Sequence, residues 1–476
     1  MSVMTTGRLL VGYSNAATHV STTMEYLSSI RRHSRYEVSY LHVTDDAVVE
    51  VDLNQFDAVL NSYCARLCFP GYVNQAYVEA LKGFRGVRLL AVQDEYHRTG
   101  AIRQAIREIG FHAVLTCVPP EQHDFVYPKE MFPDTEFVTV LTGYVPRALK
   151  AHGLRRIPLG QRPVAIGYRG RENAAYYGRL GFDKYEIGRR MREICLARGI
   201  AHDIETSEET RIYGDAWHDF LGQCRTTLGT ESGSNVFDFD GSLETKYREM
   251  TTKRGGTVGY EDFCQYTDPL ENEIQMGQIS PRIFEAAAAG TPMILFSGRY
   301  SGIVAPDEHY IELKKDFSNI DQVLDRIKHI DTLEQVADRA HRHLIQSGNY
   351  DYSRFVEIVD ALIDRNREGQ ARRACGSRRP ARPLDQRMVV DPQPVLNEQP
   401  TPWPRDAIYH RYKQLYREHE ALKREFANET GRLTREVQYL RSEFASETQR
   451  LIREVEALQS ALASRSLIRL GRAFSH

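Results

Sequence analysis

The chain has 476 residues, which is too long for one ordinary hydrophobic core and predicts two or three domains. Hydrophobic residues make up 41% of the chain and charged residues 26%, a balance typical of globular proteins. The 62 Lys and Arg residues are offset by 64 Asp and Glu residues, and the net charge of -2 gives no global basic field that would favour nucleic acid as a partner.

The amino terminus and the cysteines indicate a cytoplasmic protein. The first residues lack the charged segment and long apolar stretch of a secretory signal, and no run of 18 apolar residues predicts a membrane span. The seven cysteines are scattered, and Cys64 and Cys68, the one close pair, have no further ligands beside them to complete a metal site. We therefore expect reduced thiols and no metal site.

Apolar β-branched runs alternate with amphipathic stretches up to about residue 145, which is typical of a parallel sheet covered on both faces. We predict a Rossmann-like domain over residues 1–155. Its predicted helices cover His19–His33 and Ala101–Gly110, and its predicted strands are Arg8–Ser14, Tyr36–Val43, Phe56–Tyr63, Val87–Val92, Ala113–Val118 and Phe137–Thr142.

The same alternation restarts at Pro163 and predicts a second Rossmann-like domain over residues 156–365, with an irregular Gly-, Asp- and Thr-rich insertion at 233–277. The fold class is therefore α/β, with two domains facing a cleft where ligands commonly bind. The predicted strands are Pro163–Tyr168, His202–Glu205, Arg225–Gly229, Met293–Phe296 and Tyr310–Leu313. The predicted helices include Lys184–Ala197, Trp217–Cys224, Ser280–Ala289, Ile320–Ile330, Leu333–Ser347 and Arg354–Arg365.

The remaining residues predict a linker and a helical tail. Residues 366–404 are rich in Arg and Pro and indicate a solvated linker. Residues 405–465 carry apolar residues at four-three spacing and a repeat offset by 18 residues, which predicts a coiled coil and a homo-oligomer. Residues 466–476 are basic and amphipathic and could rest on the inner face of an anionic membrane.

The stretch Gln278–Phe296, QISPRIFEAAAAGTPMILF, is the most informative part of the sequence. Ser280 is a good N-cap, and Pro281 suits the first helical position. A helix N-terminus attracts anions, and a bound phosphate would offset the unfavourable placement of Arg282 in the first turn. Glu285 lies one turn further, where a carboxylate could bind the ribose hydroxyls of a nucleotide.

The segment PRIFEAAAAGTPMIL, with a turn at Pro306–Tyr310, resembles the C-terminal domain of GT-B-fold glycosyltransferases of the "group 1" type. The resemblance covers residues 160–365, and the amino-terminal half shares only the architecture. It implies that Glu285 holds the donor ribose. The family has a second Glu eight positions earlier, where this sequence has Gly277, and Glu231 in TLGTESGSN is a candidate substitute.

The resemblance also implies a diphosphate site in the first unit of this second domain, where GYRGR supplies Arg169 and Arg171 and GFDKYEIG supplies Lys184. Gly167 and Gly170 allow the backbone to approach a phosphate. Three residues in the loop after Phe296 would border the sugar or phosphate: Gly298, Tyr300 and Ser301.

The acceptor would bind the first domain, where several side chains follow strands and are candidate bases. These are His19 after the first strand, and Asp94, Glu95 and His97 after the fourth. Structural roles at helix starts are equally compatible with these positions. Asp238-Phe-Asp240 resembles the metal motif of another glycosyltransferase fold, but we interpret it as a turn before Gly241 and expect no metal.

These observations favour a metal-independent glycosyltransferase that uses no cofactor beyond a nucleoside diphosphate sugar as donor. The acceptor would be a glycan or a lipid-linked hydroxyl compound, in surface polysaccharide or glycoconjugate synthesis. Two alternatives remain: a nucleotide-sugar epimerase on the same fold, and a coiled-coil scaffold with a degenerate transferase domain.

Overall fold

The computed structural model describes residues 7–18, 21–45, 47, 49–152, 157–373 and 450. The chain divides into two compact units, Met1–Leu396 and Asn397–His476, and almost all described residues belong to the first. The predicted coiled coil and basic tail, and the linker beyond Arg373, lie outside the described residues apart from Arg450.

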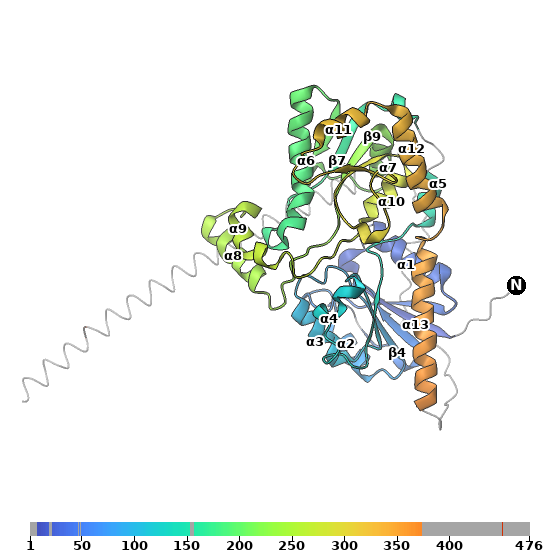
Figure 1. Cartoon of the computed structure of the whole chain (residues 1–476). Helices are drawn as coiled ribbons and strands as arrows, with labels where there is room; N and C mark the ends of the chain where they lie inside the picture. The colour runs from blue at the N-terminus through green and yellow to red at the C-terminus, as the bar shows by residue number, and fades with distance from the viewer. Residues whose placement is uncertain are drawn as a thin grey trace, which may run out of the picture. The chain divides into compact units, whose positions relative to one another are not determined.

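The first unit contains two halves, each built on a parallel sheet with helices on both faces (Figure 1). The sheet of the first half has the order β2-β1-β3-β4-β5-β6, and that of the second half has the order β11-β10-β9-β7-β8. The prediction of two α/β halves with parallel sheets is therefore confirmed, and this is the layout that the GT-B resemblance implies.

Continuous apolar runs form the strands because both faces of each sheet are buried. The strands of the first half are β1 (Arg8–Tyr13), β2 (Glu37–His42), β3 (Ala58–Asn61), β4 (Val87–Ala91), β5 (Ala113–Thr116) and β6 (Glu136–Thr139). Those of the second half are β7 (Val164–Arg169), β8 (His202–Glu205), β9 (Cys224–Gly229), β10 (Met293–Phe296) and β11 (Ile311–Leu313). All of them agree with the predicted strands to within three residues at either end.

The helices of the first half are α1 (Ser21–His33), α2 (Gln75–Gly83), α3 (Thr99–Ile109) and α4 (His123–Val126). The second half contains α5 (Arg147–His152), which packs on its core, and α6 (Gly178–Arg198), α7 (Asp215–Gln223), α10 (Pro281–Ala288), α11 (Ile320–Arg326) and α12 (Ile330–His341). No helix among the described residues is long and apolar enough to cross a membrane.

The insertion at 233–277 contains two helices that the sequence analysis did not predict, α8 (Ser242–Arg254) and α9 (Tyr260–Thr267). They pack on a small core of their own around Ala175, Val258 and Phe263. Glu244 of α8 accepts hydrogen bonds from His97 and Arg98, so the insertion is tied to the first half. Although burial raises the pKa of Glu244, these hydrogen bonds outweigh it and lower the pKa to about 2.

Helix α13 (Tyr352–Arg373) returns to the first half, although the sequence analysis placed residues up to 365 in the second domain. Phe355, Val359 and Leu362 are buried in the core that β1 and α1 form. The helix also continues eight residues beyond Arg365, into the predicted linker, and Arg367 pairs with Asp57 at 2.9 Å. The apolar face of α13 therefore covers the first sheet (Figure 1).

We expect Leu362→Ala to destabilise the first half, because Leu362 is fully buried between α13 and the sheet. Such a truncation costs about 2–5 kcal/mol of unfolding free energy. Urea unfolding would measure it, with Glu357→Ala on the exposed face of α13 as the control, which should change stability by less than about 0.5 kcal/mol. Equal stability of both variants would contradict the packing of α13 on the first half.

Candidate functional site

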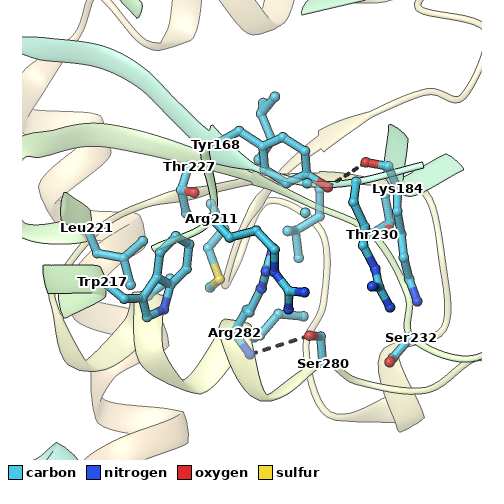
Figure 2. Close-up of a pocket in the computed structure, with 18 of the residues that line it drawn as sticks. Tyr168, Lys184, Arg211, Trp217, Leu221, Thr227, Thr230, Ser232, Ser280 and Arg282 are labelled. Atoms are coloured by element: carbon cyan, nitrogen blue, oxygen red, sulfur yellow. Dashed lines mark hydrogen bonds between the residues drawn. The ribbon is translucent and has the colours of Figure 1, made fainter. Parts of the chain in front are cut away.

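A cavity of about 240 Å³ opens at the carboxyl ends of β7 and β9 (Figure 2). Strands β8 and β9 lie on opposite sides of β7, so the winding of the sheet reverses at this point. Such reversals leave a crevice where ligands bind in open α/β sheets. We call it the cation cavity, because four basic side chains line it: Arg171, Lys184, Arg211 and Arg282.

Among the described residues, no carboxylate lines the cation cavity. Arg211 pairs with Glu208 outside the lining at 2.6 Å, and Arg171 lies 3.7 Å from the same carboxylate. Arg282 lies 5.1 Å above the ring of Trp217. The ammonium group of Lys184 makes no hydrogen bond or ion pair with any described residue. The cavity therefore carries an excess of positive charge that an anionic ligand would neutralise.

Among the basic residues of this cavity, Lys184 is the one whose pKa is most clearly lowered. Burial lowers the pKa of its ammonium from the ordinary value of 10.5 to about 8, and the negative charge of Asp94 only partly opposes this. Arg282 and Arg171 lower the pKa further by repulsion. A desolvated cation without a protein partner is costly unless a ligand compensates it.

Helix α10 begins beside this cavity, as the sequence predicts. Ser280 has extended backbone angles, and its hydroxyl accepts the N–H of Arg282 at 3.4 Å, so it is the N-cap, followed by Pro281. The N–H of Ile283 bonds the carbonyl of Ser280 at 3.0 Å. The N–H groups of Arg282 and Ile283 are thus used within the first turn. The helix contributes its dipole, the Ser280 hydroxyl proton and Arg282 instead.

A second cavity, of about 320 Å³, lies between the two halves, and we call it the cleft cavity. Four carboxylates line it, Glu25 and Asp94 from the first half and Asp215 and Glu285 from the second. No Lys or Arg is in its lining. Ser232 lines both cavities, so they meet at this residue.

Glu285 lies on the side of α10 that faces the cleft cavity and does not line the cation cavity. One carboxylate oxygen, Oε2, accepts the indole N–H of Trp217 at 2.7 Å. Trp217 in turn lines the cation cavity. Glu285 is thus fixed at the boundary of the two cavities, with Oε1 making no hydrogen bond to a described residue.

The two predicted arginines at the end of β7 lie in different surroundings. Arg171 lines the cation cavity, whereas Arg169 does not. The Arg169 guanidinium pairs with Asp203 at 2.8 Å and lies 4.4 Å from the ring centre of Phe220. The expected phosphate contact of Arg169 is therefore not supported, because a neighbouring strand, β8, supplies the acid that neutralises its side chain.

The two acidic candidate bases that follow β4, Asp94 and Glu95, also lie in different surroundings. Asp94 lines the cleft cavity, where Arg66 binds it at 2.9 Å and the Tyr96 hydroxyl at 2.7 Å. Glu95 is fully buried and accepts hydrogen bonds from the Tyr127 hydroxyl at 2.9 Å and the Cys117 N–H at 3.0 Å. Burial raises the pKa of Glu95 to about 7. Glu95 is therefore an interior residue of the first half that lines neither cavity, unlike Asp94.

The two other candidate bases are His97 and His19. His97 is buried against Glu244, 3.0 Å from its carboxylate, and joins the first half to the insertion. His19 lies outside the described residues.

Glu231 lies beside Gly277, as proposed for a Glu that is displaced in sequence. A Cβ built on Gly277 would be 3.3 Å from Glu231 Oε1. The same carboxylate accepts the N–H of Arg299 at 2.6 Å, and Gly298 packs against it. Glu231 is buried and lines neither cavity, so in this structure it holds the loop after β10.

Tyr300 and Ser301 also support that loop and line neither cavity. The Tyr300 hydroxyl donates to the carbonyl of Phe296 at 2.6 Å, and the Ser301 hydroxyl accepts the N–H of Ile279 at 3.0 Å. These bonds fix the approach to α10.

The Asp238-Phe-Asp240 segment forms the turn before α8 that we expected. Asp238 is buried and accepts the N–H groups of Leu243 and Glu244, and Asp240 accepts the N–H of Ser242. Among the described residues, no group of three His, Cys, Asp or Glu side chains could hold a metal ion.

The sequence analysis missed several lining residues, among them Glu25, Arg211 and Trp217. Trp217 is one of only two tryptophans, which is a signal worth following. Glu25 lies in the helix that follows the first strand, close to a position where such folds bind ligands. Arg211 lies in an irregular loop, and no local pattern distinguishes it.

No family model and no curated protein matches this sequence. Among solved structures, the chain is similar to a DNA-modifying β-glucosyltransferase determined with and without uridine diphosphoglucose. The identity is 11% and the TM-score 0.41, and the match covers 75% of this chain and 99% of that chain.

The chain is also similar to a glycosyltransferase from Rickettsia africae ESF-5, at 9% identity and a TM-score of 0.38, over 78% of this chain and 99% of that one. It is similar to TarM at 9% identity and a TM-score of 0.36, over 66% of this chain. The match spans 56% of the TarM chain.

We expect Lys184→Met to stabilise the protein at pH 7. The pKa of Lys184 is lower in the folded state, so the charged form costs stability below about pH 8, and the cost disappears as the pH rises toward 10.5. Each pKa unit corresponds to about 1.4 kcal/mol, so the gain should be a few kcal/mol at most. Thermal unfolding at pH 7 and pH 10 would measure it, with exposed Lys253→Met as the control. A destabilised Lys184→Met protein at pH 7 would contradict this assignment.

Proposed function

We propose that the protein transfers a glycosyl group from a nucleoside diphosphate sugar to a hydroxyl acceptor. The observation that carries the proposal is the cation cavity, which has four cationic side chains and no carboxylate at the point where the second sheet reverses. A diphosphate supplies the negative charge that this cavity lacks.

The diphosphate would bind Lys184, Arg282 and Arg171, with the Ser280 hydroxyl donating to one of its oxygens. The leaving diphosphate gains charge as the glycosidic bond breaks, and fixed cations in a partly desolvated site stabilise that charge. Lys184 suits this role because its ammonium has no described protein partner and can give its whole interaction to the ligand.

The nucleoside would lie toward Trp217 and Tyr168, the aromatic part of the same lining. Glu285 would then accept a ribose hydroxyl through Oε1, while Trp217 holds Oε2 in place. The indole hydrogen bond keeps the carboxylate oriented before the ligand arrives, which reduces the entropy lost on binding.

The transferred sugar would lie at Ser232, where the cation cavity meets the cleft cavity, and the acceptor would occupy the latter. The first half contributes Glu25, Tyr63 and Asp94 to the cleft cavity. This division follows the sequence-based expectation that the donor binds the second half and the acceptor the first. A role in polysaccharide or glycoconjugate synthesis fits such an acceptor.

Both alternatives are less well supported by these cavities. A scaffold gains nothing from a buried, unpaired Lys184, which costs stability without a ligand. An epimerase would need only one substrate cavity, whereas two cavities of opposite charge meet here at Ser232.

Binding of nucleoside diphosphates tests the proposal directly. We expect the matching nucleoside diphosphate to raise the unfolding free energy by about 2.7 kcal/mol at 100 times its Kd. Lys184→Met should weaken binding strongly, and Glu285→Ala should weaken it by roughly 1.5–3 kcal/mol, the value of a charge-assisted hydrogen bond. Lys253→Met is the matched control. Calorimetry that detects no binding by the wild-type protein would reject the proposal, and unchanged affinity in Glu285→Ala would reject the ribose contact.

We also expect sugar transfer to survive chelation. The cations of the cavity can neutralise the leaving diphosphate, which is the task a divalent metal performs in other sites. Donor turnover should therefore be the same within about twofold with and without EDTA. Loss of turnover that manganese restores would contradict this expectation and would require a metal near the diphosphate.

A further inference from the structure

Glu25 is a carboxylate that lines a cavity and has no hydrogen-bond or ion-pair partner among the residues that the structure describes. It lies on α1, in the helix that follows the first strand, and it lines the cleft cavity opposite Glu285. Its carboxylate makes no hydrogen bond or ion pair with any described residue. The other acidic residue on the first-half side, Asp94, is held by Arg66 and Tyr96.

The surroundings of Glu25 favour its protonated form. Burial raises its pKa to about 7, and the charge of Glu285 on the opposite half adds to this effect. The other ionisable groups in the lining are Asp94, Asp215, His218, Tyr63, Tyr144 and Tyr352. No Lys or Arg belongs to the lining, so no cation there opposes the shift.

We propose that Glu25 binds the reacting hydroxyl of the acceptor in the cleft cavity and takes its proton during transfer. The inference rests on the proposed function and deepens it. The acceptor oxygen forms a bond to the anomeric carbon as its proton moves to the Glu25 carboxylate. The bond from that carbon to the diphosphate breaks, and its electron pair leaves with the diphosphate in the cation cavity.

Glu25 suits this role better than its acidic neighbours. Asp94 already accepts two hydrogen bonds, and Trp217 holds Glu285. Asp215 lies in the first turn of α7 and already interacts with another residue. A general base works best when its pKa is near the working pH, and a carboxylate with a free lone pair can reach the substrate proton directly.

The same lining defines the class of acceptor. Four carboxylates line the cavity and Arg66 pairs with Asp94 alone, so the lining repels phosphate, sulfate or carboxylate groups near the reacting hydroxyl. Tyr63, Tyr144, Phe284 and Tyr352 add aromatic surface, and Gln93 and Gln278 add amide groups. Aromatic rings beside polar groups suit a polyhydroxyl compound. The acceptor is therefore an uncharged or amine-bearing polyol or sugar.

Glu25→Gln tests the role of the carboxylate, with Glu130→Gln, an exposed residue of the same half, as the control. Transfer would be measured to a methyl glycoside, to its 2-amino analogue and to its 6-phosphate. We expect Glu25→Gln to bind nucleoside diphosphate as the wild type does, and to lose about 10²–10⁴-fold in kcat/KM for the acceptor. The wild-type kcat/KM should rise with pH through about 7, and the variant should lack this rise.

Stability separates a catalytic role from a structural one. The pKa of Glu25 is raised in the folded state, so its ionised form destabilises the fold above the ordinary carboxyl range. Glu25→Gln should therefore have a higher Tm than the wild type at pH 8, and the gain should shrink toward pH 5. A lower Tm at pH 8 would identify Glu25 as a structural residue and overturn the inference.

The outcomes distinguish this inference from the proposed function. If the wild-type protein transfers sugar and Glu25→Gln transfers it at a similar rate, the base assignment is wrong while the function stands. A phosphorylated acceptor that reacts better than the neutral one would overturn the acceptor class. If the wild-type protein binds no nucleoside diphosphate, the proposed function itself fails.

Discussion

When the chain adds strands on both sides of the first strand of a parallel sheet, the direction of winding reverses once beside that strand. The cation cavity and the cleft cavity each lie at such a reversal. In the first sheet β2 and β3 flank β1, and in the second β8 and β9 flank β7. The helices that follow the two flanking strands leave in opposite directions, so the carboxyl ends of the strands between them stay open. Tyr63 and Glu25 therefore reach one cavity, and Lys184 and Thr230 reach the other.

The two cavities differ in the charge of their linings, and this difference determines how a ligand is oriented across them. One lining has four cations and no acid, and the other has four acids and neither Lys nor Arg. A ligand with an anionic end and a neutral end has only one favourable orientation across Ser232. The arrangement costs folding free energy on both sides, since burial shifts the pKa of Lys184 downward and that of Glu25 upward. Ionisable groups whose pKa values are shifted at a cost in stability are common at binding and catalytic sites.

The sequence predicts the strands well, because buried parallel strands are continuous apolar runs with few alternatives. It also predicts the start of α10, where Ser280 and Pro281 are local signals. It does not predict α8 and α9, because polar surface helices that cover a small core have weak patterns. Whether Arg169 or Arg171 faces the cation cavity depends on Asp203, which pairs with Arg169. Whether Asp94 or Glu95 faces the cleft cavity depends on Thr116 and Tyr127, which donate hydrogen bonds to Glu95. These partners are distant in sequence, so only the fold reveals which side chain faces a cavity.

The chain crosses between the halves twice, once before α5 and once before α13, and the two crossings are hydrogen-bonded. The Val145 N–H donates to the carbonyl of Tyr350 at 2.8 Å, and the Tyr352 N–H to that of Val145 at 3.3 Å. The insertion makes a separate tie through Glu244 and Arg98, away from these crossings (Figure 1). The two halves are therefore joined at two places, by backbone hydrogen bonds at Val145 and by the side chains of Arg98 and Glu244. Glu25 and Glu285 line the cleft cavity from the two halves, and the charge of Glu285 raises the pKa of Glu25, so the ionisation of Glu25 depends on how these contacts hold the halves together.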